Sequence, residues 1–315
     1  MKKRVFIYEP LHEKALEYLE AKCEVIRASA YDQATVVREV PGAEAIIIRA
    51  LGRVSAEVMD AAGRPIVIAR QGVGVDNIDL EAAKDRGIRV INSPKGNTLA
   101  VAEHFILLAL GLARKVRKLD ACLRSGDWSS LDDYAAVELT GRTLGVLGFG
   151  NIGQLVAKLC SAAFGMTVLF ASRNPHEKEA EALGAERVDV EELFKQADFI
   201  AICQALTPET KNLVDARLIG LMKTNAYLIN LSRGGVWNEE AVAAALSAGT
   251  IAGAASDVYQ QEPLPISHPF LGCGNFFGTP HSSALTTEAL YRIDMDVAEH
   301  VLDILEGRPP RHFLV

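Results

Sequence analysis

Short apolar runs alternate with amphipathic stretches along most of the chain. Short apolar runs predict buried strands, and stretches with apolar residues three and four positions apart predict helices. In the first third of the chain we predict strands at residues 5–8, 24–27, 45–48, 66–69 and 90–92. Amphipathic helices are predicted between them, at residues 11–22, 55–62 and 80–86. A strand followed by a helix, repeated many times, is typical of parallel βαβ units.

The second part of the chain shows the same alternation. A longer helix is predicted from about residue 99 to residue 119, where apolar side chains recur on one face. It leads to predicted strands at residues 143–147, 167–170, 199–202, 226–230, 251–256 and 275–277, and a last helix is predicted at 288–305. The chain has 315 residues, and domains contain roughly 150 residues each. The pattern therefore predicts an α/β protein with two parallel-sheet domains.

Charge and composition exclude several classes of partner. The formal net charge is −7 and no basic block stands out, so neither nucleic acid nor an anionic membrane is expected as a partner. The longest apolar stretch, residues 105–113, is too short to span a bilayer. The basic first four residues precede only four apolar ones, too few for a signal peptide. The five cysteines form no CxxC pair, so we predict a cytoplasmic enzyme with reduced thiols and no metal.

A glycine-rich turn follows the predicted strand at residues 143–147. Gly148 permits a tight turn, Gly150 lets a pyrophosphate approach the backbone, and Gly153 allows close helix–strand packing. With Asn151 and Ile152 between them, these residues open a helix whose N-terminal amides favour an anion. A purely structural turn is the alternative interpretation, but the strand before and the helix after it provide the context that dinucleotide binding requires.

The residue that reads the adenosine ribose is expected about twenty positions later, at the end of the next strand. Ser172 and Arg173 stand there, and no Asp or Glu occurs between Gly153 and Glu177. A hydroxyl and a guanidinium suit a 2′-phosphate, so we predict NADP(H) in preference to NAD(H). The alternative is that Arg173 is a solvated loop arginine that stacks on the adenine.

Hydride transfer to a 2-oxo acid needs a cation for the carboxylate, an acid for the carbonyl oxygen and a group that supports that acid. Arg233, Glu262 and His281 each follow a predicted strand in the dinucleotide-binding half, where the sites of open α/β sheets lie. Taken singly, each could be an ordinary loop side chain. Their shared placement favours a catalytic set.

The motifs together have a specific order and spacing, at residues 72–79, 148–153, 232–235, 257–263 and 279–281. In these motifs the chain resembles the D-isomer-specific 2-hydroxyacid dehydrogenases, a family that includes phosphoglycerate, glyoxylate and hydroxypyruvate dehydrogenases or reductases. The resemblance implies two doubly wound domains. A Rossmann coenzyme domain, residues 98–286, is inserted into a flavodoxin-like substrate domain, residues 1–97 plus 287–315.

The resemblance also implies roles for individual residues. His281 would be the general acid/base, Glu262 would orient it, and Arg233 would bind the substrate's carboxylate and carbonyl. Asp257 would hold the nicotinamide carboxamide. We also assign Ser232 and Thr207 to the coenzyme site, although the segment at residues 203–207 departs from the usual family pattern, as does the Ser pair at 282–283.

The substrate side of the resemblance leaves two alternatives open. The amides around Val73 and Gly74 would take the substrate carboxylate. Arg49 and Arg70, which end predicted strands, would suit a phosphate or sulfonate, or they are structural cations at the sheet edge. The sequence therefore predicts a small 2-hydroxy or 2-oxo acid, with a 3-phosphoglycerate dehydrogenase-type enzyme as an alternative.

Two further expectations concern assembly and class. The resemblance implies a homodimer through the coenzyme domain, formed by the long helix and the arm that follows it, at about residues 99–140. The family also contains corepressor-like members that use the nucleotide-bound fold as a binding module. Turnover of a 2-oxo acid would separate an enzyme from such a module.

Overall fold

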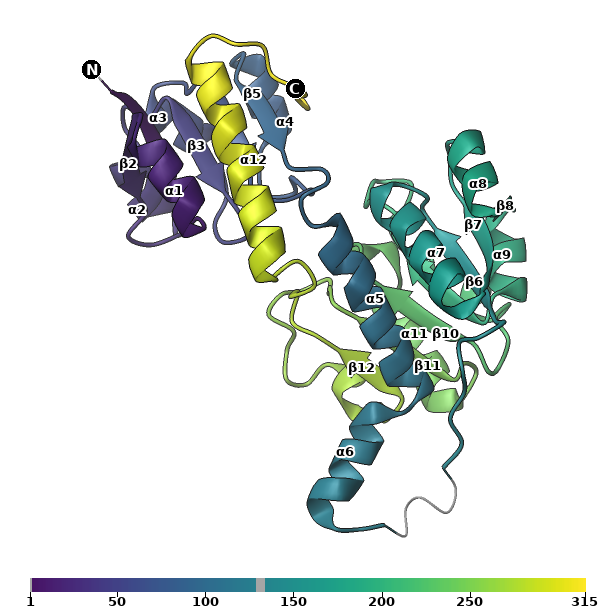
Figure 1. The fold of residues 1–315 in the computed structure, drawn as a ribbon. Helices are drawn as coiled ribbons and strands as arrows, with labels where there is room; N and C mark the ends of the chain where they lie inside the picture. Colours follow the sequence, from purple (N-terminus) through teal and green to yellow (C-terminus); the bar gives the residue numbers. More distant parts are fainter. Residues whose placement is uncertain (1, 129–133) are drawn as a thin grey trace. The chain divides into compact units, whose positions relative to one another are not determined.

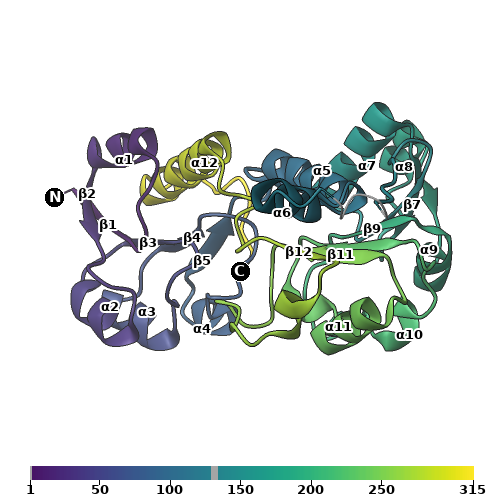
Figure 2. The ribbon, with the colours of Figure 1, turned by 90° about the horizontal axis from the view of Figure 1, so that it is seen from below.

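A computed structural model describes residues 2–128 and 134–315 of the chain. Its residues divide into two compact units. Unit 1 contains Met1–Asn97 and Ala284–Val315, and unit 2 contains Thr98–Ser283. Each unit has its own parallel sheet with helices on both faces (Figures 1 and 2).

The sheet of unit 1 has five parallel strands in the order β2-β1-β3-β4-β5. The strands are β1 Lys3–Ile7, β2 Cys23–Arg27, β3 Ala45–Ile48, β4 Val67–Arg70 and β5 Arg89–Asn92. The helices are α1 Glu13–Glu20, α2 Gln33–Glu39, α3 Ala56–Ala62, α4 Leu80–Asp85 and α12 Thr287–Leu305. This strand order is that of flavodoxin-like folds, and it confirms the predicted class of this domain.

Successive side chains of these strands pack on opposite faces of the sheet, as the pleat requires. Val5 and Ile7 lie in a core with residues of α1 and α12, whereas Phe6 lies in a second core with residues of α2, α3 and α4. Figure 2 shows the sheet between these two helical layers. Because both faces are covered, the strands are nearly continuously apolar. For this reason they can be predicted as short apolar runs in the sequence.

The sheet of unit 2 has seven parallel strands in the order β12-β11-β10-β9-β6-β7-β8. The strands are β6 Thr143–Leu147, β7 Thr167–Ala171, β8 Glu186–Arg187, β9 Phe199–Ile202, β10 Tyr227–Asn230, β11 Gly253–Ser256 and β12 Phe276–Gly278. The helices are α5 Thr98–Ala113, α6 Val116–Ser125, α7 Asn151–Phe164, α8 Glu177–Leu183, α9 Val190–Gln196, α10 Ala216–Ile219 and α11 Glu239–Ala248. Read from β8, this is the Rossmann order with one added strand, and its direction reverses between β6 and β9.

The predicted helix at residues 99–119 is wrong as a single element. It is two helices, α5 and α6, and the chain turns between them at Lys115, which has a left-handed φ of 48°. The buried side chains of α5 end at Ala113, and α6 has none. Because the next residues are mostly cationic, no buried face extends the helix. The predicted dimer arm includes residues 129–133, which lie outside the described part of the chain.

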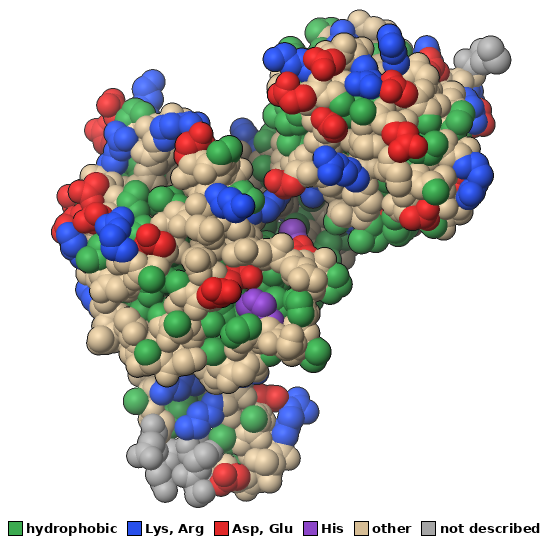
Figure 3. All heavy atoms as spheres, turned by 180° about the vertical axis from the view of Figure 1, so that it is seen from behind, with side chains coloured by type: hydrophobic (Ala, Val, Ile, Leu, Met, Phe, Trp, Pro, Cys, Tyr) green, Lys and Arg blue, Asp and Glu red, His purple; other side chains and the backbone are tan. Residues whose placement is uncertain are grey.

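Acidic and basic side chains are interspersed on the face of the molecule shown in Figure 3. None of the described helices combines the length and the apolar character needed to cross a membrane.

Candidate active site

The glycine-rich turn of unit 2 joins β6 to α7. Gly148 has a φ of +95°, and a Cβ there would lie 2.7 Å from the amide nitrogen of Gln204. A Cβ on Gly153 would overlap the carbonyl oxygen of Gly148, whereas Gly150 faces open space. The turn is therefore closely packed at Gly148 and Gly153, where it meets the loop after β9 and the start of α7. It is open at Gly150, next to the first amides of α7 at Asn151 and Ile152. This shape fits a pyrophosphate at the helix N-terminus.

The predicted ribose-reading residues directly follow β7. Ser172 is half-buried and Arg173 is exposed. A second arginine, missed in the sequence, lies beside them: Nη2 of Arg187 donates to the carbonyl oxygens of Ser172, at 2.9 Å, and Arg173, at 3.3 Å. Arg187 belongs to the two-residue strand β8, which pairs with β7. A strand this short leaves no hydrophobic pattern, so only the sheet pairing reveals the contact.

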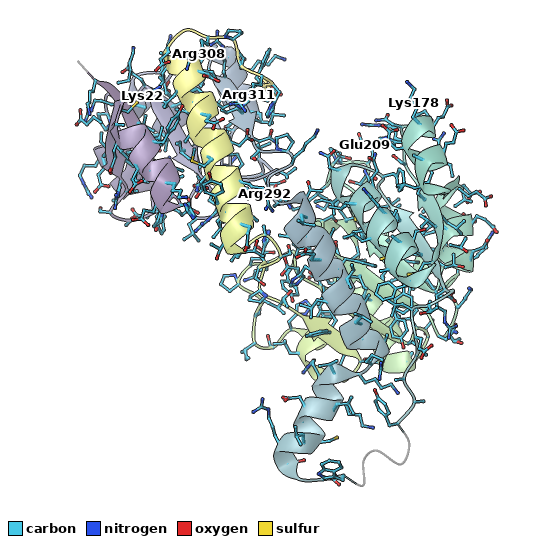
Figure 4. The ribbon with its side chains drawn as sticks, in the orientation of Figure 1. Lys22, Lys178, Glu209, Arg292, Arg308 and Arg311 are labelled. Atoms are coloured by element: carbon cyan, nitrogen blue, oxygen red, sulfur yellow. The ribbon has the colours of Figure 1, made fainter. Side chains whose placement is uncertain are left out.

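A carboxylate missed in the sequence also lies near Arg173. The hydroxyl of Thr207 donates to Glu209 at 2.7 Å. This hydrogen bond is the main cause of the lowered pKa of Glu209, and the charge of Arg173 contributes to the lowering. Glu209, labelled in Figure 4, lies at the same end of unit 2 as Lys178 of α8. The loop after β9 thus brings an acidic group close to Arg173, although none occurs in the sequence near Ser172.

Arg233 sits in a tightly held loop after β10. The side chain of Asn230 accepts hydrogen bonds from the amide and hydroxyl of Ser232, at 3.0 and 2.9 Å, and donates to the carbonyl of Arg233 at 3.0 Å. A Cβ on Gly234 would overlap the backbone of Tyr259 and Gln260. Only glycine therefore lets the loop after β10 press against the loop after β11, and this approach brings Arg233 towards the loop that contains Glu262.

Glu262 and His281 form a direct pair across two loops. Nδ1 of His281 lies 2.7 Å from Oε2 of Glu262, and the amide of Tyr259 donates to Oε1 at 2.9 Å. Partial burial raises the pKa of Glu262, but the hydrogen bonds from His281 and Tyr259 and the charges of His281 and Arg233 outweigh it, so the pKa is lowered. An ionised carboxylate only accepts, so Nδ1 carries a proton and Nε2 remains for a substrate.

Asp257 follows β11 and is fully buried. Its Oδ1 accepts from the Thr279 hydroxyl, at 2.6 Å, and from the Ser282 amide, at 2.8 Å, and its Oδ2 accepts from the Ser283 amide at 2.9 Å. The residue that the resemblance assigned to the nicotinamide thus also holds both sides of the segment that contains His281. No group of three or more metal-ligand side chains occurs within residues 2–128 and 134–315.

The predicted substrate residues of unit 1 lie at the carboxyl ends of two neighbouring strands. Arg49 directly follows β3, and Arg70 ends β4, where it pairs in register with Ile48. The side-chain amide of Asn92 donates to the carbonyl of Val73 at 2.7 Å. Within residues 2–128 and 134–315, the backbone amides of Val73 and Gly74 donate no hydrogen bond. These two amides remain available to an anion.

The buried carboxylate of Glu9 organises the backbone beside Arg49. It accepts from the amides of Arg49, Ala50 and Leu51, at 2.8, 2.5 and 2.6 Å. Glu9 receives three backbone donors and thereby holds the turn that follows β3. Nothing in the sequence around Glu9 predicted this function, because its partners lie about 40 residues away.

Comparison with known proteins bears directly on this site. Residues 106–283 match the family model described as D-isomer specific 2-hydroxyacid dehydrogenase, NAD binding domain. The chain is 39% identical over 305 residues to the D-3-phosphoglycerate dehydrogenase of Methanocaldococcus jannaschii, an alignment that covers 96% of this chain and 58% of that protein. The chain spans 55–58% of the length of three such curated relatives.

Two solved structures are similar over almost the whole chain. A protein of Thermus thermophilus is 38% identical with a TM-score of 0.91, and 99% of this chain and 100% of that chain are covered. The NADPH-dependent glyoxylate/hydroxypyruvate reductase of Sinorhizobium meliloti, solved with NADP and malonate, is 27% identical with a TM-score of 0.88, and 100% and 97% are covered. The family match lies in unit 2, which is therefore a nicotinamide-dinucleotide-binding domain. The chain belongs to the D-isomer specific 2-hydroxyacid dehydrogenase family.

Proposed function

We propose that the protein is an NAD(P)-dependent D-2-hydroxyacid dehydrogenase, which interconverts a small 2-hydroxy acid and its 2-oxo acid. The observation that carries this proposal is the 2.7 Å pair of Glu262 and His281, held beside Arg233 at the ends of three adjacent strands. These are the acid, its support and the cation that the reaction requires.

Each of the three side chains has a distinct task in this proposal. Arg233 binds the carboxylate and polarises the carbonyl of the 2-oxo acid. In reduction, Nε2 of His281 gives a proton to the carbonyl oxygen, and Glu262 stabilises the imidazolium before that transfer. In oxidation, neutral His281 takes the hydroxyl proton. The nicotinamide supplies or accepts the hydride when it is bound.

The coenzyme would be held by the turn and strand ends of unit 2. Gly148, Gly150, Gly153 and the amides of Asn151 and Ile152 would receive the pyrophosphate. Ser232 and Thr207 would line the same side, and Asp257 would face the carboxamide. The fit rests on the turn, whose open front at Gly150 leaves backbone accessible to a ligand.

We further propose that NADP(H) is preferred to NAD(H). Arg173 and Arg187 are two cations at the end of β7, and Ser172 adds a hydroxyl. Glu209 acts against this preference, because its carboxylate lies within the electrostatic reach of Arg173. Two guanidinium groups against one carboxylate still favour a 2′-phosphate.

Two substrate classes remain as candidates. Curated relatives are D-3-phosphoglycerate dehydrogenases, and Arg49 and Arg70 at adjacent strand ends suit a phosphate. A structural neighbour is a glyoxylate/hydroxypyruvate reductase, and the amides of Val73 and Gly74 suit a plain carboxylate. The test is a panel of 2-oxo acids, which includes glyoxylate, hydroxypyruvate, phosphohydroxypyruvate and a sulfonated analogue, each assayed with NADH and NADPH. Absence of turnover with every member would contradict an enzymatic role and favour a corepressor-like module.

A homodimer is part of the proposal. Helix α6 has no buried residue, and Val116, Leu123 and Trp128 are 47%, 65% and 66% exposed. Val116 and Leu123 are seven residues apart and share one face of α6, and exposed apolar patches mark protein–protein contacts. Sedimentation of the protein with Leu123→Lys would test it, because a dimer through this face should dissociate. The cytoplasmic location predicted from the sequence stays a prediction.

A further inference from the structure

His104 of α5 takes part in a short hydrogen-bonded chain behind the catalytic loop. Its Nε2 lies 2.9 Å from the hydroxyl of Thr279, which in turn lies 2.6 Å from Oδ1 of Asp257. The His104 side chain is 13% exposed and the Asp257 side chain is fully buried. None of the sequence motifs includes His104, and the mechanism above does not use it.

Helix packing fixes the position of His104 relative to the loop. Gly111 lies seven residues later, which is two turns along the same helical face. A Cβ on Gly111 would overlap the ring of Phe277 in β12, so α5 lies unusually close to this strand. Thr279 directly follows β12. The close approach at Gly111 therefore places His104 against the first residue of the catalytic loop.

The direction of the hydrogen bonds follows from the donors and acceptors. Both oxygens of Asp257 accept from backbone amides, so the hydroxyl of Thr279 donates to this carboxylate. A hydroxyl has one proton, so its oxygen can only accept from His104, and Nε2 of His104 carries the proton. Burial lowers the pKa of His104, against the opposing charge of Asp257. The ring is therefore neutral at neutral pH, with its proton on Nε2.

The loop that this chain of bonds holds is strained. His281 has a φ of 51°, a left-handed conformation that costs a non-glycine residue free energy and persists only where neighbouring contacts enforce it. Asp257 bonds the amides of Ser282 and Ser283 directly after it. The hydroxyl of Tyr259 donates to the carbonyl of Thr279 before it, at 3.1 Å.

We propose that His104 is a positioning residue for His281. It orients the Thr279 hydroxyl towards Asp257, and Asp257 then fixes segment 279–283 in the conformation that presents His281 to the substrate. His104 touches neither the substrate nor the proton that is transferred. The inference rests on the proposed role of His281, but not on the identity of the 2-oxo acid or the coenzyme.

A matched pair of variants tests the proposal. His104→Gln keeps an N–H at about the position of Nε2, and His104→Leu fills the space without a donor. We expect kcat to fall roughly two- to tenfold in H104L, the change in rate that corresponds to one neutral hydrogen bond. We expect H104Q to retain most of the wild-type kcat. Coenzyme affinity, measured by titration of NAD(P)H fluorescence, should change by a smaller factor than kcat in H104L, because the pyrophosphate turn lies apart from Asp257.

A second readout does not need turnover. Hydrogen exchange of the amides of Ser282 and Ser283 should be faster in H104L than in the wild type and near normal in H104Q, at equal thermal stability of the two variants. Thr279→Val, which removes the hydroxyl at constant shape, should behave like H104L. Equal kcat and equal exchange in H104L and H104Q would overturn the inference.

The variant His281→Ala separates this inference from the proposed function. If H281A loses activity while H104L and H104Q do not differ, the proposed function stands and the role of His104 is refuted. If H281A retains near-normal turnover, the proposed role of His281 as the general acid/base is wrong. The exchange data then decide whether His104 holds the loop.

Discussion

Replacing Glu262 with Gln tests the electrostatic support of His281. The side chain keeps its shape and an acceptor, but it loses the negative charge next to Nδ1. The two groups are 2.7 Å apart, and a hydrogen bond with a charged partner contributes about 1.5–3 kcal/mol. The His281 and Glu262 side chains are 41% and 36% exposed, so solvent screening reduces this to about 1–2 kcal/mol.

The sign of the effect follows from which form Glu262 stabilises. Its carboxylate favours the protonated imidazole, so in the variant the proton leaves at a lower pH. At about 1.36 kcal/mol per pH unit, the midpoint of the pH profile of kcat moves down by about one pH unit. Reduction, which needs protonated His281, should therefore decline at a lower pH. Oxidation, which needs the neutral form, should extend to a lower pH.

The assay is the pH profile of kcat in both directions, with the best substrate from the panel. Glu239 offers a matched control, because it pairs with His268 at 3.3 Å in the same unit. Glu239→Gln removes the charge of a second Glu–His pair. Because Oε1 of Glu239 also accepts from the amide of Gln260, in the loop that contains Glu262, the midpoint of the pH profile should shift less than in Glu262→Gln. An unchanged midpoint in Glu262→Gln, or an equal shift in both variants, would refute the reasoning.

Four other variants test the remaining roles. His281→Ala should lower kcat roughly 10²–10⁴-fold at constant coenzyme affinity, and near-normal turnover would remove it from the mechanism. Arg233→Lys keeps the charge but loses the planar fork, so the KM of the 2-oxo acid should rise far more than that of the coenzyme; an equal rise would indicate a structural role. The wild type should prefer NADPH by about tenfold or more in kcat/KM, with a smaller margin at high salt. The double variant Ser172→Asp, Arg173→Ala should reverse the preference for NADPH, whereas Arg187→Ala should only reduce it. A wild type that uses NADH equally well would contradict the assignment of Ser172 and Arg173 to a 2′-phosphate.

The sequence predicted the fold well because both sheets are buried on both faces. Strands β3, β6 and β9 have the predicted ends, and the other predicted strands differ by one or two residues. Two failures have a common cause. Strand β8 has only two residues, too few for a pattern, and the break at Lys115 is a backbone turn without Gly or Pro. A local conformation that is marked by no characteristic residue type or hydrophobic pattern cannot be predicted from periodicity.

Three residues of the candidate site could also be predicted, because they follow strands of the buried parallel sheet. Arg233, Glu262 and His281 each follow a strand, and parallel strands place their carboxyl ends at one edge of a sheet. Strand order therefore converts positions far apart in the sequence into neighbours. The Glu262–His281 contact required no knowledge of the side-chain packing beyond this rule.

Side chains that do not directly follow one of these strands cannot be placed by this rule. Arg187 reaches Ser172 through pairing of β8 with β7, and Glu209 approaches Arg173 through the loop after β9. His104 meets Thr279 because Gly111 lets α5 approach β12. Each contact depends on a register or a packing distance, which a single sequence does not specify. For this reason the sequence predicts which side chains the strand ends bring together, whereas the proposed coenzyme preference and loop positioning depend on contacts between elements.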